Sequence, residues 1–325
     1  MIEMAVSSEA PMIPRLAIFA SRSSVPRSWD LPSFVDAAKT SGFAGVEMAL
    51  AELGRDEIEQ RASADAIRSS DLQLIVDISS APSITSSTTQ SLSSPLDHAR
   101  VFESQLRGIS ALGDVVSHVN CTQSGDNRWD VATSAEYLGE VLPLSAQFLE
   151  GHPYIGRYGR ETDIMGGSPH HLTGISHETN AARGVLHHPD AVRELMEILP
   201  PIRITSDIQQ WHDSCGYQWG FGDDAIDGDD EEEEALRVEI VPHVDHIRAG
   251  LVRETVAPHD ELWKFVWGRK AKRGVEQVTI TPALRVIDTS DGAAEDKTLW
   301  EQTQKVADCI RRSYDHWVKS ESGKK

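Results

Sequence analysis

Short apolar segments alternate with amphipathic segments along most of the chain. Eight of them have the composition of buried strands, at residues 16–20, 45–50, 72–78, 115–120, 174–178, 202–207, 244–249 and 278–281. The segments between or after them have helical spacing, at residues 31–39, 58–69, 95–111, 135–149, 189–199, 236–240, 259–272 and 300–319. Such alternation is typical of a parallel sheet, and eight strands close into a barrel that side chains can fill. The pattern therefore predicts an α/β fold, a single (β/α)8 TIM barrel.

The length of 325 residues suits one such barrel and leaves short flanks. We expect a loose lead-in at 1–14, the barrel at 15–320 and a tail at 321–325. Two segments interrupt the alternation, a Ser/Thr-rich one at 79–94 and an insertion at 216–234 that contains nine acidic residues. Because such an acidic segment buries little apolar surface, we expect its acidic run at 223–234 to be solvated, mobile and dispensable for folding, with a lid or a weak cation collector as the alternative.

Composition and sequence motifs argue against several classes of binding partner and enzyme reaction. The formal net charge of −20 disfavours nucleic acid, whose recognition depends on Lys and Arg at phosphates. No apolar run is long enough for a membrane span, and the N-terminal residues lack the order of a signal peptide. Three scattered cysteines indicate a reducing compartment, so we expect a cytoplasmic protein. No nucleophile elbow or P-loop motif is present.

Two carboxylates stand at the C-terminal ends of buried strands. Glu178 follows apolar residues 174–175, and Asp207 follows Ile202, Ile204 and Thr205. The strands of a parallel barrel all end at the face where sites form. A carboxylate in this position needs a cationic partner, either a metal or an arginine. The pair therefore predicts a site, and the alternative is that arginines pair with both acids to brace the barrel mouth.

Other polar or aromatic residues in the pattern favour packing. Cys121 lies in an apolar strand, and His177 points to the face opposite Glu178 by strand alternation. Trp263 and Trp267 are four positions apart on a helix, which favours a shared place in the core.

Four motifs together resemble a known superfamily of barrels. They are Gly-Phe-Ala-Gly-Val-Glu at 42–47, Asn-Cys-Thr-Gln-Ser-Gly-Asp-Asn-Arg-Trp at 120–129, His-Glu-Thr-Asn-Ala-Ala-Arg at 177–183 and Ser-Asp-Ile-Gln-Gln-Trp at 206–211. Their order and spacing resemble the xylose-isomerase-like superfamily, also called the sugar phosphate isomerase/epimerase family. The resemblance extends over about residues 16–316.

The resemblance implies a site chemistry. Such barrels hold a divalent metal (Mn²⁺, Mg²⁺, Co²⁺ or Zn²⁺) with Glu, Asp, His and Glu from strands five to eight, and a carboxylate moves a proton on a carbon beside a carbonyl. It implies an isomerase or epimerase of a sugar, polyol or keto-acid, with Glu178 and Asp207 as catalytic residues and metal ligands. The expected substrate contacts are Glu47, Asn120, Gln123, Trp129, Arg183, Trp211 and Arg248.

The chain departs from this ligand pattern at two of four positions. Arg248 stands where the strand-seven His is expected, and Ala283 stands where the strand-eight Glu is expected. One hypothesis is a weak metal site in which His246 joins Glu178 and Asp207. The other is a metal-free relative, a lyase or a small-molecule-binding protein, in which Arg248 bridges the two carboxylates. Assembly into a homo-oligomer stays open.

Overall fold

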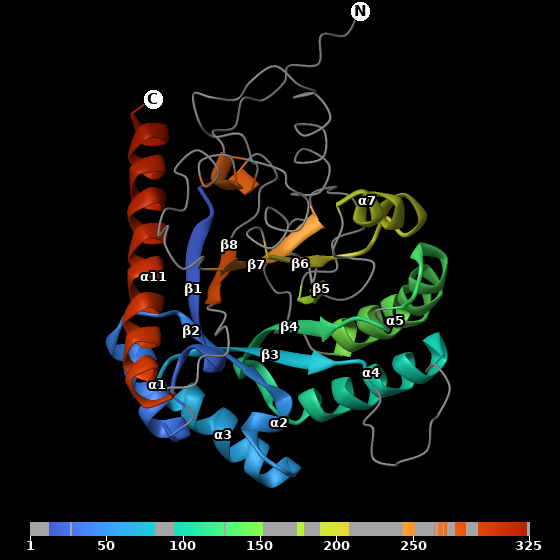
Figure 1. Ribbon diagram of the computed structural model, residues 1–325, viewed down its shortest axis with the longest axis horizontal. Helices are drawn as coiled ribbons and strands as arrows, with labels where there is room; N and C mark the ends of the chain where they lie inside the picture. Colours follow the sequence, from blue (N-terminus) through green and yellow to red (C-terminus); the bar gives the residue numbers. More distant parts are fainter. Residues whose placement is uncertain are drawn as a thin grey trace, which may run out of the picture.

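The structure is a computed structural model that describes residues 13–26, 28–81, 94–126, 128–151, 174–178, 189–207, 243–250, 263, 266–268, 270–271, 277–283 and 292–323. Its eight parallel strands form a closed barrel in which each strand pairs with its neighbours in sequence and β8 pairs with β1 (Figure 1). The strands are β1 (Arg15–Ser21), β2 (Gly45–Ala49), β3 (Gln73–Ser79), β4 (Val116–Gln123), β5 (Ile175–Glu178), β6 (Ile204–Asp207), β7 (Val244–Gly250) and β8 (Gln277–Ala283). The predicted single (β/α)8 barrel is confirmed.

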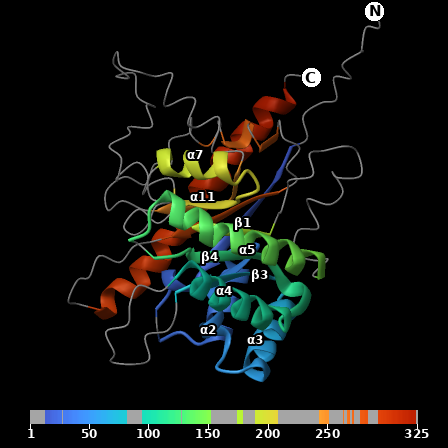
Figure 2. The same ribbon diagram turned by 90° about the vertical axis from the view of Figure 1, so that its right-hand side faces the viewer.

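Helices cover the outside of the barrel. They are α1 (Leu31–Thr40), α2 (Leu50–Leu53), α3 (Glu57–Ser69), α4 (Pro95–Ser110), α5 (Val131–Gly151), α7 (Pro189–Ile198) and α11 (Gly292–Ser322). Figure 2 shows α4, α5 and α7 next to one another on one side, while α11 packs beside β1 and β8. No helix in the described ranges is long and apolar enough to cross a membrane.

Local sequence signals set the start of several helices. The Asp30 carboxylate accepts a hydrogen bond from the Ser33 backbone N–H at 2.9 Å and caps α1. Ser94 and Asp97 form a capping box at the start of α4, with Pro95 at the first helical position. These caps explain why the predicted starts of α1 and α4 agree with the structure.

The structure corrects some boundaries and leaves other predictions untested. The last helix begins at Gly292 instead of Trp300 and continues to Ser322, so it extends into the expected tail at 321–325. The four-residue helix α2 has no counterpart in the predicted pattern. The lead-in up to residue 12, the helix at 236–240, most of the Ser/Thr-rich loop and the acidic insertion at 216–234 lie outside the described residues.

The main core lies between the barrel and its helices. The outward faces of the strands contribute residues such as Val46, Leu74 and Val119, and the helices contribute residues such as Phe34 and Phe102. Cys121 is fully buried in this layer, as expected. Trp263 and Trp267 are also buried there and stack with ring centroids 5.3 Å apart, which confirms their predicted packing.

The inside of the barrel is divided into an apolar part and a polar part. Ala17, Phe19 and Ile75, from β1 and β3, form a small separate apolar cluster. Gly45 on β2 makes room for it, because a Cβ there would overlap the Phe19 ring and the carbonyl oxygen of Gln73. The strands from β4 to β8 instead contribute buried polar side chains, which are His118, Asn120, Ser176, Thr205, His246 and Thr281. The polar part leads to the strand ends where the candidate site lies.

Candidate active site

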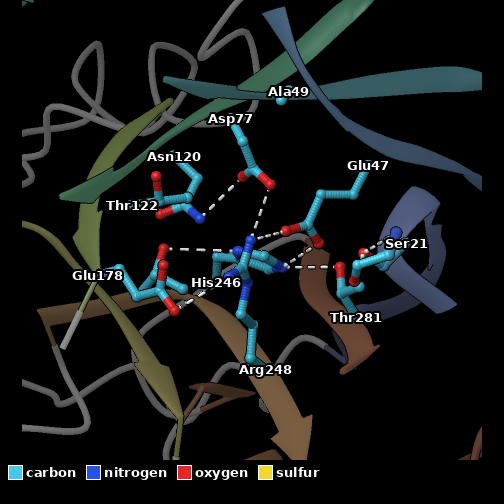
Figure 3. Close-up of polar contacts among 12 residues, drawn as sticks. Ser21, Glu47, Ala49, Asp77, Asn120, Thr122, Glu178, His246, Arg248 and Thr281 are labelled. Carbon is cyan, nitrogen blue, oxygen red and sulfur yellow. Dashed lines mark hydrogen bonds and ion pairs between the residues drawn. The ribbon is translucent and has the colours of Figure 1, made fainter. Parts of the chain in front are cut away.

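One guanidinium joins three carboxylates at the C-terminal end of the barrel. Arg248 Nη1 donates to Glu178 Oε1 at 2.9 Å, and Nη2 donates to Asp77 Oδ2 at 2.9 Å and to Glu47 Oε1. Figure 3 shows Arg248 at the centre of this group, which we call the arginine cluster. Asn120 Nδ2 extends it by donating to Asp77 Oδ1 at 3.0 Å.

Strand register explains why these residues meet. Asp77 pairs in register with Asn120, and Arg248 pairs with Asp207 and Thr281, whereas Glu47 lies two residues lower, level with Ile75. Side chains on a strand alternate between the two faces, so residues at equivalent inward positions of a closed barrel must face one another. Four strands, β2, β3, β5 and β7, therefore deliver one charged group each to the same place.

The arginine cluster is mostly withdrawn from water. Only 15% of the Arg248 side chain is exposed, against 0% for Glu47, 16% for Asp77 and 7% for Glu178. Buried charges repay their desolvation only when they are paired in good geometry. The forked guanidinium supplies that pairing, because it can donate to several carboxylates at once.

The surroundings shift the pKa values of Glu47 and Asp77 in opposite directions. Burial would raise the pKa of Glu47, but the positive charge and the hydrogen bond of Arg248 outweigh it, and the pKa falls below its usual range. Burial raises the pKa of Asp77 well above its usual range, and the negative charge of Glu47 adds to this effect against Arg248. Burial opposes the charged form of Arg248, yet its three carboxylate neighbours raise its pKa. Of Glu47 and Asp77, Asp77 is therefore the one that more readily holds a proton.

A chain of polar side chains crosses the barrel interior beneath the arginine cluster. His118 Nε2 lies 2.7 Å from Ser176 Oγ, which lies 2.5 Å from Thr205 Oγ1. Thr205 Oγ1 lies 3.4 Å from His246 Nδ1, and His246 Nε2 lies 2.9 Å from Thr281 Oγ1. The interior thus satisfies its buried polar groups mainly with one another.

His246 connects this chain to the arginine cluster. Its Nε2 lies 3.7 Å from Glu47 Oε2. Burial lowers the pKa of His246 to about 3 and that of His118 to about 4, so both rings are neutral near pH 7. His246 therefore contacts Glu47 as an uncharged imidazole whose two nitrogens already have partners.

Among the described residues of the site, three buried polar atoms have no hydrogen-bond partner. They are Arg248 Nε, Glu47 Oε2 and Asn120 Oδ1. Buried polar atoms are rarely left in this state, and each such atom needs an explanation. A donor and two acceptors together suit a ligand that carries hydroxyl or carbonyl groups.

The structure brings together four of the residues expected at the site. Glu47, Asn120, Glu178 and Arg248 belong to the arginine cluster or contact it directly, and His246 lies just below. The expected Arg248–Glu178 bridge is present. Its other partners are Glu47 and Asp77, and the Asp207 side chain lies outside the described part of the chain, as do Arg183 and Trp211.

Two other expected contacts lie in different surroundings. Gln123 is exposed at the end of β4, where Ser79 Oγ lies 3.4 Å from its Oε1. Trp129 packs against His98 and Tyr137, with ring centroids 4.7 and 5.8 Å away. Their roles toward a substrate stay predictions. His177 faces the helices as predicted and stacks on Phe102 at 5.9 Å.

Sequence reasoning missed Asp77 and Thr281. Asp77 is a charged residue near the end of the apolar strand β3, the same signal that identified Glu178 and Asp207. Thr281 precedes the Pro-Ala sequence of β8 and holds His246 Nε2. An isolated threonine in a strand carries no such signal, because threonine is common in strands.

The donor set formed by the described residues does not fit the divalent metal that the resemblance implies. Glu178 is bonded to a guanidinium, and Arg248 and Ala283 cannot serve as ligands at their positions. Among the described side chains, no group of three or more His, Cys, Asp and Glu residues is placed to hold a metal ion. We therefore assign no chemical step to a metal.

Comparisons with known proteins give matches among solved structures alone, because no protein-family model and no curated protein matches the sequence. A D-allulose 3-epimerase from Methylomonas sp., solved with D-allulose, has 10% identity and a TM-score of 0.58 over 94% of this chain and 100% of its own. The probable 3-DHS dehydratase AsbF from Bacillus anthracis has 12% identity and a TM-score of 0.54, over 90% and 98%.

A third match carries the name of the superfamily. It is a xylose isomerase domain containing protein from Salmonella typhimurium, with 11% identity and a TM-score of 0.53 over 95% of this chain and 99% of its own. All three matches extend over most of both chains, and their low identities establish likeness of fold. This chain therefore has the same (β/α)8 barrel fold as these three proteins.

Proposed function

We propose that this chain is an isomerase or epimerase that moves a proton on a small sugar, polyol or keto-acid. The observation that carries the proposal is the arginine cluster, in which carboxyls and one cation converge at the face where barrel enzymes place their sites. Similar structures include sugar 3-epimerases and a 3-keto-D-glucoside 4-epimerase, so the fold supports this chemistry elsewhere.

The proposed reaction requires a base, an acid and a positive charge. A carboxylate, Glu178 or Asp207, takes a proton from the carbon beside a carbonyl, and the C–H electron pair forms a C=C bond while negative charge passes to the carbonyl oxygen. A second carboxyl returns a proton to carbon, on the opposite face for epimerisation. For isomerisation the proton goes to the former carbonyl carbon, while the proton of the neighbouring hydroxyl moves to the former carbonyl oxygen. Asp77 suits this second role because burial raises its pKa well above the usual range.

The atoms without partners suit a hydroxylated substrate. Asn120 Oδ1 and Glu47 Oε2 would accept from hydroxyl groups, and Arg248 Nε would donate to an oxygen. Gln123, Trp129, Arg183 and Trp211 remain proposed substrate contacts from the sequence. A place in carbohydrate metabolism follows from such a substrate.

Dehydration is the second candidate. A protonated Asp77 beside a base could give its proton to a leaving hydroxyl after the same first step, which would make the protein a lyase. The likeness to a probable 3-DHS dehydratase favours this candidate. A metal-free binding protein would hold the same substrates without exchanging their protons.

Proton exchange in D₂O tests the proposal directly. The purified protein is incubated with D-fructose, D-allulose or D-tagatose, and NMR follows loss of C–H signal and the appearance of an isomer. We expect exchange with at least one substrate and a fall of about 10²–10⁴-fold in Glu178→Gln, because a general base contributes that much. Glu140→Gln, an exposed change on α5, is the control.

Each outcome separates the candidates. Exchange with formation of an isomer supports an isomerase or epimerase, whereas exchange with loss of water identifies a lyase. Binding of these sugars with no exchange at any carbon would contradict both enzyme candidates and leave a binding protein.

A further inference from the structure

We infer that the Arg248 guanidinium takes the place of a divalent metal in this barrel and serves as a cation built into the chain. The inference deepens the proposed function, because it names the group that would hold the negative charge formed on the substrate. Its first support is position. Arg248 donates to Glu178 at 2.9 Å, and its Cα pairs in register with that of Asp207. These are the two acids that the resemblance makes metal ligands.

The second support is charge balance. Three carboxylates from three strands, Glu47, Asp77 and Glu178, all accept hydrogen bonds from this one side chain. Among the described residues within this group, Arg248 is the only permanent positive charge, since the neighbouring His246 is buried and neutral. A divalent ion placed among these acids would meet a buried charge of the same sign.

The third support is the missing ligand capacity. The guanidinium has no lone pair to offer, and alanine at position 283 offers none either. Thr281, the β8 residue in register with Arg248, is engaged with His246 Nε2 at 2.9 Å. Neither of the two positions where the resemblance places a β7 or a β8 ligand therefore offers one.

The guanidinium can also perform part of a metal ion's task. Three of its hydrogen bonds go to the carboxylates, its Nε has no partner, and 15% of the side chain stays exposed. Preorganised N–H donors stabilise charge that develops on a substrate oxygen, particularly where water is excluded. Arg248 would thus hold the enolate oxygen by hydrogen bonds where a metal would bind it as a Lewis acid.

Titration with Mn²⁺ tests the inference without relying on activity. The wild-type protein is dialysed against a chelator, and free Mn²⁺ is then measured by electron paramagnetic resonance. We expect only weak binding with no saturable site per chain. The double variant Arg248→His with Ala283→Glu restores the expected ligand types, so we expect one site per chain that binds at least about 100-fold more tightly. Arg61→His with Ala62→Glu, the same exchanges at exposed positions of α3, is the matched control for surface binding.

The wild-type measurement decides the matter even if the double variant fails to fold. One tight Mn²⁺ per chain that is lost in Glu178→Gln would overturn the inference, and so would a folded double variant that binds no better than the control.

The D₂O assay separates the two proposals. Exchange that survives chelation supports both, exchange that requires added metal rejects the inference and keeps the function, and absent exchange rejects the function while the Mn²⁺ result still stands.

Discussion

At the scale of the residue, the candidate site depends on how a few buried charges are paired. The sequence indicates Glu47, Glu178 and Arg248 as site residues because a charged side chain in an apolar strand needs a partner. The sequence does not indicate which side chains these residues pair with in the folded protein. Arg248 and Glu47 are 201 positions apart, and their contact depends on the register of the whole barrel. Asp77 offered the same signal as Glu178 but lay outside the motifs that carried the resemblance.

The protonation of Asp77 gives the first residue-scale prediction. A carboxyl whose pKa is raised by folding binds more protons in the folded state, so its contribution to stability declines as pH rises from about 4 through the folded pKa. In Asp77→Asn this decline is absent. We expect the free energy of unfolding of the variant, relative to wild type, to increase between pH 5 and pH 9, by as much as about 1.4 kcal/mol per pH unit, and the melting temperature to rise with it.

Thermal unfolding across this pH range measures the effect. Asp36→Asn, an exposed change on α1, should show a constant difference from wild type. A difference for Asp77→Asn that is equally constant would mean that the Asp77 carboxyl is ionised throughout the range.

At the scale of the element, the sequence predicted all eight strands and most helices that the structure describes. Strong periodicity and caps such as Asp30 and Ser94 set these elements locally. The errors are at boundaries. The helix α11 begins eight residues before the expected start, and the short helix α2 follows β2 directly with too few residues for a periodic pattern. Tertiary packing, which a local pattern does not contain, sets such boundaries.

The strand β2 offers an element-scale prediction at Gly45. A side chain at this position would collide with Phe19 inside the barrel and with the backbone of Gln73. Gly45→Ala should therefore lower the free energy of unfolding by about 1–3 kcal/mol, the usual range for overpacking. Urea denaturation monitored by circular dichroism measures the loss.

A glycine in an open position is the matched control. A Cβ added at Gly139 in α5 would have no other atom within 4 Å, so Gly139→Ala should leave stability unchanged or raise it by up to about 1 kcal/mol. Equal midpoints for Gly45→Ala and wild type would show that the apolar cluster has space to adjust.

At the scale of the whole molecule, the arginine cluster connects distant parts of the barrel. Arg248 on β7 bonds to residues of β2, β3 and β5, so one side chain spans the mouth. The apolar cluster fills only the part of the interior near β1 and β3. Charge pairing thus contributes to closing the end of the barrel where the site lies, in addition to the core beneath the helices.

Removing this connection should weaken the entire fold. Arg248→Met leaves the buried carboxyl groups of Glu47, Asp77 and Glu178 without their cation, and we expect a loss of about 3–5 kcal/mol in urea unfolding at pH 7. Adding Glu47→Gln should recover part of that loss, because one fewer buried charge then lacks a partner. Arg55→Met, which breaks an exposed pair with Glu59, should change stability by less than about 1 kcal/mol. A similar small change for Arg248→Met would show that the carboxyls are readily hydrated or protonated.

A cation that is part of the chain also alters how the protein depends on its surroundings. Proteins whose sites take up a dissociable metal ion compete with one another for that ion. The ion that binds most strongly is often not the one that best supports the reaction. Arg248 is synthesised with the protein in a ratio of one to one and cannot be exchanged. On our proposal, growth conditions that deplete or poison the cellular supply of such ions would leave this protein as competent as before.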